Sequence, residues 1–333
     1  MTFRRSAKLG ASVFSISLVL AAATACGSDE EKTAANGDPT VVFQTIPAST
    51  SALLAAQIDA AGLEKKYHVN VEVKAAGSLN ASFQEFITGR SDCIVGDPYS
   101  FGLKASDGLP IHVAATIAST GGYVLADEKS GIKTPADLKG KRLASAVGGS
   151  LHLLMDTAAQ NWYGTSFEDD VNVIQSESAP AIAQLAAGKL DATLTYETSA
   201  SALFNKAKNF HVAYDMGPDY QKNLGVDELW QTVLLCRKDH NLETKTVGQF
   251  TAMLKDAGEQ LNKDPKATDA LAVSSFDAEP NAYGEAFKSG RLAFNIRPVD
   301  AGVAKSITDV VGLMTKTGTM EKFDLPADYL KAE

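Results

Sequence analysis

The amino-acid sequence predicts an α/β protein built on largely parallel β-sheets. Short runs of β-branched and apolar residues alternate with stretches in which apolar residues recur at helical spacing. The turns that join a strand to the next helix are rich in Gly, Ser and Thr, and the series restarts near residue 121. Residues 40–333 are about twice as long as a typical domain, so we expect two lobes.

The first series of elements runs from residue 40 to residue 119. Its strands are apolar or alternate cleanly, and its helices carry an apolar face. The expected elements are a strand at 40–46, one helix at 49–67 capped by Ser49, Thr50 or Ser51, a strand at 69–75, a helix at 80–90, a strand at 93–97, a helix opened by Pro98 and a strand at 111–119.

The second series repeats the scheme after residue 121. The expected elements are a short helix at 133–140 with Pro135 in its first turn, a strand at 142–147, a helix at 150–163, a strand at 171–176, a helix around 179–188 and a strand at 191–196. From about Glu243 the chain becomes mostly helical, which predicts that it wraps back over the first lobe.

The N-terminus has the features of a secretory signal. Arg4, Arg5 and Lys8 precede an uncharged apolar stretch, and small residues lead into Cys26. The segment Ala23–Ser28 (ATACGS) resembles a bacterial lipobox, although Ala23 stands where leucine is more usual. We therefore predict a signal peptide at 1–25 and lipidation of Cys26. A short membrane helix that stays attached is the alternative, but a span needs about 20 apolar residues.

Composition limits the possible partners and cofactors. Residues 26–39 are small and acidic with nothing large to bury, so we expect a disordered tether. The net charge is −9, and loss of a signal peptide with three basic and no acidic residues takes it to −12. This charge makes nucleic acid an unsuitable partner. The five histidines are scattered without metal-ligand spacing, so no metal or other cofactor is expected.

Two cysteines remain once Cys26 carries lipid. Cys93 and Cys236 both stand in apolar runs typical of buried strands. Outside the cytoplasm two such thiols could pair. Because both positions are expected to be buried, the sequence favours free buried thiols, with a disulfide as the alternative.

Three blocks of sequence resemble the nitrate, sulfonate and taurine binding proteins, a family that also has thiamine-pyrimidine-binding relatives. The blocks are FITGRSDCIVGDPYSFGLKASDGLPIHVAAT at 86–116, TPADLKGKRLASAVGGSLHLLMDTA at 134–158 and LAAGKLDATLTYETSASAL at 185–203. They occur in the order found in that family, and the resemblance extends from about residue 41 to residue 240.

The resemblance implies a two-lobed type II periplasmic-binding-protein fold, with two mainly parallel sheets joined by two hinge crossings. Lobe I would comprise 40–125 and 237–333 and lobe II 126–236, with crossings near Tyr123–Ala126 and Val233–Arg237. It implies a monomeric, non-enzymatic substrate-binding component of an ABC importer, which delivers a small solute to a permease and ATPase. With the lipobox, this places the protein on the outer face of the bacterial cytoplasmic membrane.

Matching positions imply ligand contacts in both lobes. The implied contacts are Gln44, Thr45, Thr50, Ser51, Asp97 and Tyr99 in lobe I, and Ser150, His152, Tyr196 and Glu197 in lobe II. The residue types are consistent with this role, because helix starts offer unpaired N–H groups and a partial positive charge that can hold an anion.

Each of these residues also has a structural interpretation. Thr50, Ser51 and Ser150 are good helix caps, and Asp97 can cap the helix that Pro98 opens. Tyr196 can be a packing residue. Near a helix N-terminus a cationic histidine is disfavoured, so His152 is expected to be a neutral donor or a satisfied core histidine.

The residues after the last strand of lobe II leave the ligand open. Where the family commonly has a tryptophan, a polar residue and a proline, this chain has Tyr196, Glu197 and Thr198. With Asp97 and Glu197 as possible cleft carboxylates, two ligand classes remain. The expected ligand is a small polar or anionic solute of the sulfonate, nitrate or taurine type, which the resemblance implies is captured between the lobes by hinge closure. The alternative is a thiamine-pyrimidine or another amine-bearing heteroaromatic solute, whose N–H groups a carboxylate could bind.

Enzymatic function has little support in the sequence. The loop before Ser150 lacks the lysine of a phosphate-binding loop, and Ser150 does not stand in a GxSxG motif. An enzyme on the same fold, or an anchored sensor lipoprotein, remains the alternative of another class.

Overall fold

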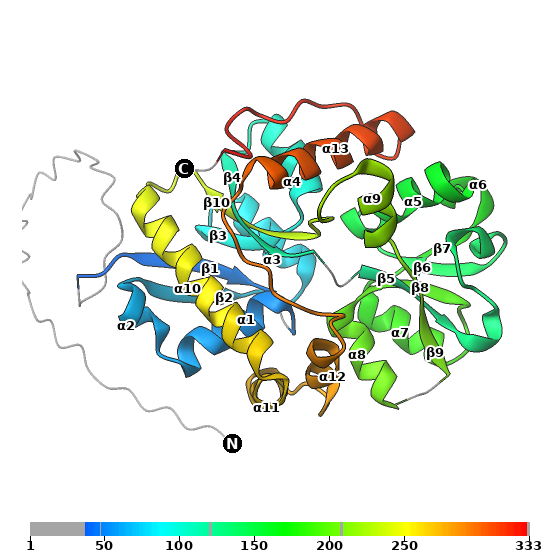
Figure 1. Ribbon diagram of the computed structural model, residues 1–333, viewed down its shortest axis with the longest axis horizontal. Coiled ribbons are helices and arrows are strands. Elements are labelled where there is room, and N and C mark those ends of the chain that lie inside the picture. The colour runs from blue at the N-terminus through cyan, green and yellow to red at the C-terminus, as the bar shows by residue number, and fades with distance from the viewer. Residues whose placement is uncertain (1–36, 47, 120–121, 207–208, 332–333) are drawn as a thin grey trace, which may run out of the picture. The chain divides into compact units, whose positions relative to one another are not determined.

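The computed structural model describes residues 37–46, 48–119, 122–206 and 209–331, which form two five-stranded sheets (Figure 1). The first contains, in spatial order, β2 (Asn70–Ala75), β1 (Thr40–Thr45), β3 (Cys93–Gly96), β10 (Thr232–Arg237) and β4 (Ile111–Ala118). The second contains β7 (Asn172–Gln175), β6 (Arg142–Ser145), β8 (Ala192–Tyr196), β5 (Gly122–Asp127) and β9 (Phe210–Asp215).

Both sheets are mixed and mainly parallel. In the first sheet only β10 runs against its neighbours, and in the second only β5 does so. The predicted α/β class with two mainly parallel sheets is therefore confirmed.

Helices connect and cover these strands. They are α1 (Thr50–Ala60), α2 (Leu63–Tyr67), α3 (Leu79–Ile87), α4 (Pro98–Ser106), α5 (Ser150–Tyr163), α6 (Phe167–Asp170), α7 (Ser178–Ala186), α8 (Glu197–Lys206), α9 (Gly217–Leu224), α10 (Thr244–Lys263), α11 (Pro265–Phe276), α12 (Ala282–Lys288) and α13 (Ala301–Thr317), with short 3-10 helices at Glu128–Ser130 and Pro135–Leu138. The single helix expected at 49–67 is wrong. It is divided into α1 and α2 because Gly62, with φ of 61°, takes a left-handed conformation that an α-helix cannot continue through.

The chain passes between the sheets twice. It leaves the first sheet after Ala118 and enters the second at Gly122, and it returns between Asp215 and Thr232. Both passages lie slightly N-terminal to the predicted crossings, so β5 belongs wholly to the second sheet and β10 wholly to the first. A Cβ atom at Gly122 would come within 2.4 Å of Gln231 Oε1 and 2.7 Å of Leu151 Cδ1, so both side chains would have to shift to accept a larger residue. The lobe boundaries themselves stay a prediction.

Two apolar clusters account for most of the core. On one face of the first sheet Phe43 packs against Phe250 of α10, with ring centroids 5.3 Å apart. The other cluster extends from the first sheet to the second and includes Ile307 of α13. Helix α13 packs against α4, but also against α5 and α9 beside the second sheet (Figure 1). It differs in this respect from the expectation that the C-terminal helices accompany lobe I alone.

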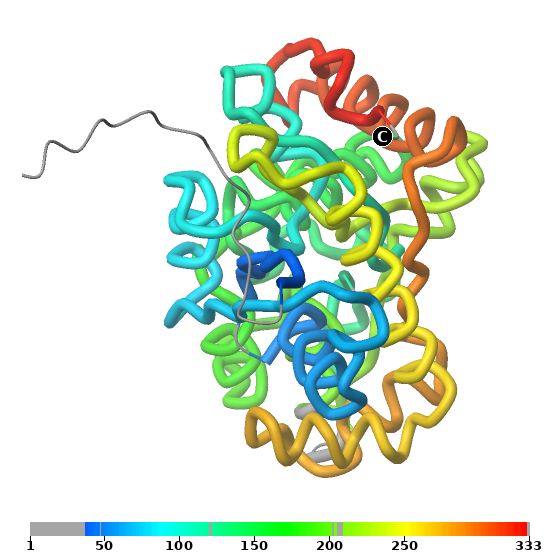
Figure 2. Tube along the Cα trace, turned by 90° about the vertical axis from the view of Figure 1, so that its left-hand side faces the viewer, coloured from blue at the N-terminus to red at the C-terminus, as the bar shows by residue number. Residues whose placement is uncertain are grey.

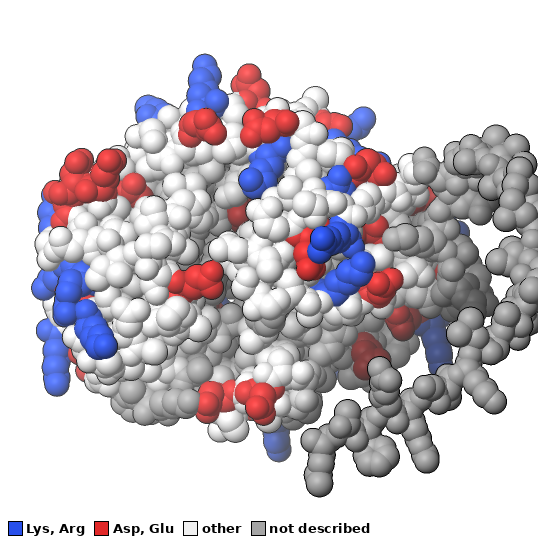
Figure 3. Space-filling view, turned by 180° about the vertical axis from the view of Figure 1, so that it is seen from behind, with Lys and Arg blue, Asp and Glu red and all other residues white. Residues whose placement is uncertain are grey.

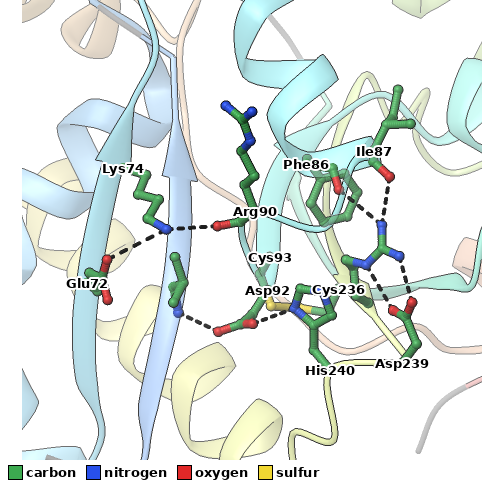
Figure 4. A network of polar contacts seen from close by, with 12 residues as sticks. Glu72, Lys74, Phe86, Ile87, Arg90, Asp92, Cys93, Cys236, Asp239 and His240 are labelled. Carbon is green, nitrogen blue, oxygen red and sulfur yellow. Dashed lines mark hydrogen bonds and ion pairs between the residues drawn. A yellow bond between two sulfur atoms is a disulfide. The ribbon is translucent and has the colours of Figure 1, made fainter. Parts of the chain in front are cut away.

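The expectation of free thiols is wrong, because Cys93 and Cys236 form a disulfide (Figure 4). The two residues lie opposite each other in the antiparallel β3–β10 pair, with Cα atoms 4.1 Å apart, so the ladder itself brings the sulfur atoms together. Both side chains are fully buried, as the sequence predicts.

A polar network surrounds the disulfide at the edge of the sheet where β3 begins. Asp92 accepts a hydrogen bond from the backbone N–H of Val42 at 2.7 Å and lies 2.6 Å from His240 Nδ1 (Figure 4). The guanidinium of Arg237 donates to the carbonyl oxygens of Phe86 and Ile87, which end α3. This network therefore fixes the edge of the sheet opposite to the carboxyl ends of β1 and β3.

The N-terminal predictions fall mostly outside the described residues. The signal peptide, Cys26 and residues 27–36 of the tether all lie there. The last tether residues are described, and the Pro39 carbonyl accepts a hydrogen bond from the N–H of Asn70 in β2. Within residues 37–331, apart from the gaps given above, no helix has the length and apolar character needed to cross a membrane.

Candidate ligand-binding site

The expected ligand residues lie where strands end and helices begin. β1, β3 and β6 are followed after a few residues by α1, α4 and α5, and β8 leads directly into α8. In each sheet these strands run in the same direction, so their carboxyl ends share one edge. This edge is where open α/β sheets bind ligands.

Asp97 is buried at the start of α4. Its carboxylate accepts hydrogen bonds from the N–H groups of Tyr99 and Ser100, at 3.1 and 2.7 Å, so it caps the helix. Burial raises the pKa of Asp97, and the N–H donors and the Ser150 hydroxyl only partly offset this effect. Asp97 is therefore a helix cap whose ionised form is disfavoured by burial.

Ser150 connects this carboxylate to the second sheet. It is the first residue of α5, while Gly149 occupies the cap position. Its hydroxyl interacts with the side chains of both Asp97 and Tyr196. Burial, together with the nearby charge of Asp97, raises the pKa of Tyr196 to about 12, so the phenol stays protonated. Asp97, Ser150 and Tyr196 thus meet across the two sheets.

Two further residues of this group carry buried polar atoms without a partner among the described residues. Neither amide atom of Gln44 has a hydrogen-bond partner, and the same holds for the Tyr99 hydroxyl. Both side chains are fully buried. An unsatisfied buried polar group costs about 1–3 kcal/mol, so these atoms are suited to a bound polar molecule that would complete their hydrogen bonds.

The hydroxyls after β1 are used mainly within their own loop. Ser49 is the cap of α1, and Ser51 Oγ accepts from the N–H of Ile46 at 3.0 Å. Thr45 donates to the carbonyl of Lys74 at 3.2 Å, and Thr50 begins α1. Of the three caps that the sequence allows, the structure selects Ser49.

His152 faces neighbours beside the second sheet. Its Nδ1 lies 2.9 Å from Ser145 Oγ, and its ring makes an edge contact with Phe167. Burial lowers the pKa of His152, with the charge of Asp156 opposing the effect, so the neutral form is favoured. These contacts correspond to the core-histidine interpretation.

Glu197 is paired with a residue that the sequence analysis missed. Arg291 Nε lies 3.1 Å from each carboxylate oxygen, and the Ser201 hydroxyl also donates to Glu197. Burial still raises the pKa of Glu197 above its usual value. No local pattern in the sequence could reveal the pair, because its members are 94 residues apart. Within the described part of the chain, no group of three or more His, Cys, Asp or Glu side chains could hold a metal ion.

The structure has two mainly parallel sheets, and the helices that follow their strands begin close to one another. This arrangement is the periplasmic-binding-protein fold. Solved structures support this class. The aliphatic sulphonate binding protein SsuA from Escherichia coli is 18% identical, with a TM-score of 0.69 over 85% of this chain and 89% of that one. The alkanesulfonate-binding protein SsuA from Xanthomonas axonopodis pv. citri, bound to MOPS, is 19% identical, with a TM-score of 0.70 over 87% of this chain and 96% of that one.

The sequence match is more specific about the family. Residues 46–268 match the family described as NMT1/THI5 like, and the chain belongs to this family. No curated protein sequence matches the chain significantly. The resemblance to binding proteins drawn from the sequence blocks is therefore confirmed at the level of family and fold.

Proposed function

We propose that the protein is the solute-binding component of an ABC importer, which captures a small polar solute between its two sheets by hinge closure. The carrying observation is the meeting of Asp97 with Ser150 and Tyr196 across the sheets. The polar side-chain atoms of Gln44 and Tyr99 are also buried without a partner among the described residues. A ligand that contacts both sheets favours the closed state by its differential affinity. Family membership and the sulfonate-binding structural neighbours support the same function.

The proposal includes an extracytoplasmic, lipid-anchored and monomeric protein that works with a permease and an ATPase. The Cys93–Cys236 disulfide supports the location, since such bonds persist in oxidising compartments. Metabolic labelling with a radioactive fatty acid tests the anchor. Cys26→Ala should abolish labelling and release the protein from membranes, and unchanged labelling would exclude this anchor.

The chemistry of the site favours a ligand that donates hydrogen bonds. Asp97 is a buried acceptor, and the guanidinium of Arg291 is already paired with Glu197. A carboxylate binds amino and ring N–H groups well, whereas it repels an anion. We therefore place an amine-bearing heteroaromatic solute, such as a thiamine-pyrimidine, ahead of a sulfonate, nitrate or taurine-like solute.

Thermal unfolding in the presence of candidate solutes tests this function. An aminopyrimidine, taurine, methanesulfonate and nitrate are added in turn, and a solute at 100 times its Kd stabilises the folded state by about 2.7 kcal/mol. We expect the aminopyrimidine to raise Tm, and chromatography to recover it unchanged. A shift with the anions alone would reassign the ligand, and turnover of the solute would indicate an enzyme.

A substitution locates the binding site. Ser150→Leu should abolish the shift, because the larger apolar side chain would occupy the junction of Asp97 and Tyr196. Ser274→Leu, at an exposed position of α11, is the matched control and should retain the full shift. Retention of the shift by Ser150→Leu would place the ligand elsewhere.

A further inference from the structure

Arg291 contacts three residues that belong to the second sheet or to a helix beside it. Its Nε contacts both oxygens of Glu197, and its guanidinium lies 5.2 Å from the ring centre of Phe204. Its own carbonyl accepts a hydrogen bond from the Tyr123 hydroxyl at 2.7 Å. Glu197 and Phe204 come from α8, and Tyr123 comes from β5.

The chain just after Arg291 is fixed to the first sheet instead. The Asn295 N–H donates to the Ile117 carbonyl of β4 at 2.9 Å, and the Thr116 N–H donates to the Arg297 carbonyl at 2.9 Å. The Phe294 N–H donates to the side-chain oxygen of Asn262 in α10, a helix that packs against β4. Figure 2 shows this segment, in orange, leading from α12 towards α13. Arg291 therefore connects the second sheet to a segment anchored on the first.

The ion pair between Arg291 and Glu197 should resist separation of the two sheets. The Glu197 side chain is completely buried, and that of Arg291 is 31% exposed. A buried carboxylate that loses its partner is strongly unfavourable, so separation of α8 from Arg291 carries a cost. The contact between Asn80 of α3 and Glu177, at 3.4 Å, is exposed and offers far less resistance.

We propose that Arg291 and Glu197 form a latch that favours the closed arrangement of the two sheets without touching the solute. The inference rests on the proposed function, in which closure accompanies capture. Apparent affinity depends on the fraction of molecules in the binding-competent state. The latch therefore sets affinity through the open–closed equilibrium, while Asp97, Ser150 and Tyr196 supply the contacts.

Small-angle X-ray scattering and amide hydrogen exchange test the latch on the solute-free protein. Arg291→Gln and Glu197→Gln should each increase the radius of gyration. Each should also accelerate exchange in the first turn of α8 by about tenfold. Arg291→Lys keeps the charge but loses the planar fork, and it should give an intermediate result. Circular dichroism confirms that each variant is folded.

Arg142→Gln is the matched control. Arg142 makes a two-bond pair with Asp191, at 2.8 and 3.1 Å, that is more exposed than the Arg291–Glu197 pair, and both residues belong to the second sheet and its adjoining turn. Its loss should leave the radius of gyration unchanged. The latch is refuted if Arg291→Gln and Arg291→Lys scatter and exchange like the wild type, or if Arg142→Gln produces the same expansion. Because no solute is added, this outcome is independent of whether the proposed ligand binds.

Discussion

At the scale of single residues, Asp97 is a helix cap, and we propose that it also binds the solute. Its hydrogen bonds to the N–H groups of Tyr99 and Ser100 explain the start of α4. The same carboxylate lies among groups from the second sheet and is buried. The cap and contact interpretations of Asp97 are therefore compatible, since the backbone of α4 orients the oxygens that a solute would meet.

The raised pKa of Asp97 predicts a pH dependence of stability. The folded state binds this proton more tightly than the unfolded chain, whose pKa lies near 3.8. The stability contribution is full when both states are protonated, and it is lost as the pH rises through the raised folded pKa. Asp97→Asn keeps the cap and cannot ionise. We expect its unfolding free energy to exceed that of the wild type increasingly as the pH rises above 4, as measured by urea unfolding. A gap that narrows over this range would contradict the assignment.

Substitution of Gln44 should affect stability and ligand binding in opposite directions. Its amide is fully buried without a partner among the described residues, so Gln44→Leu removes an unsatisfied polar group. We expect the unfolding free energy of the solute-free protein to rise by about 1 kcal/mol, and the Tm shift with the bound solute to fall. Gln260→Leu removes an amide that is paired with Gln57 and should destabilise instead. A destabilised Gln44→Leu would show that the amide is satisfied in solution.

At the scale of helices and strands, the sequence predicts an element well where a residue in the local sequence, such as a glycine, ends that element. Helix α5 occupies the predicted residues 150–163, because Gly149 and Gly164 bound it. The helix expected at 49–67 fails at Gly62, although that glycine is visible in the sequence. Pairings between distant strands leave no local signal. This explains why the sequence left the disulfide as an alternative only. The Arg291 contacts also join residues far apart in the chain, so they leave no local signal either.

The disulfide between β3 and β10 should contribute strongly to stability. It closes a loop with a sequence separation of 143 residues. Replacement of both Cys93 and Cys236 by alanine should lower the unfolding free energy by about 2–5 kcal/mol in urea unfolding. A reductant should destabilise the wild type and leave the double variant unaffected. Equal sensitivity of the two proteins to reductant would show that the bond is absent in solution.

At the scale of the whole described body, the C-terminal third joins structures that the sequence assigns to separate lobes. Helix α13 donates from Ser306 to the Glu228 carbonyl before β10, and Asn161 of α5 contacts Thr317 at 2.7 Å. The surface gives fewer functional signals. On the face shown in Figure 3, basic and acidic side chains are interspersed. The family and fold could thus be predicted from ordered sequence blocks, whereas the contacts between the sheets could not.

The position of β10 between β3 and β4 also determines when the first sheet can form. β4 is synthesised more than a hundred residues before β10. The strands on either side of β10, β3 and β4, pair with β10 and not with each other. The first sheet therefore cannot be completed until the whole second sheet has been synthesised, and such non-local pairing is intrinsically slow. Closure of the Cys93–Cys236 bond then marks the moment at which the late strand has arrived.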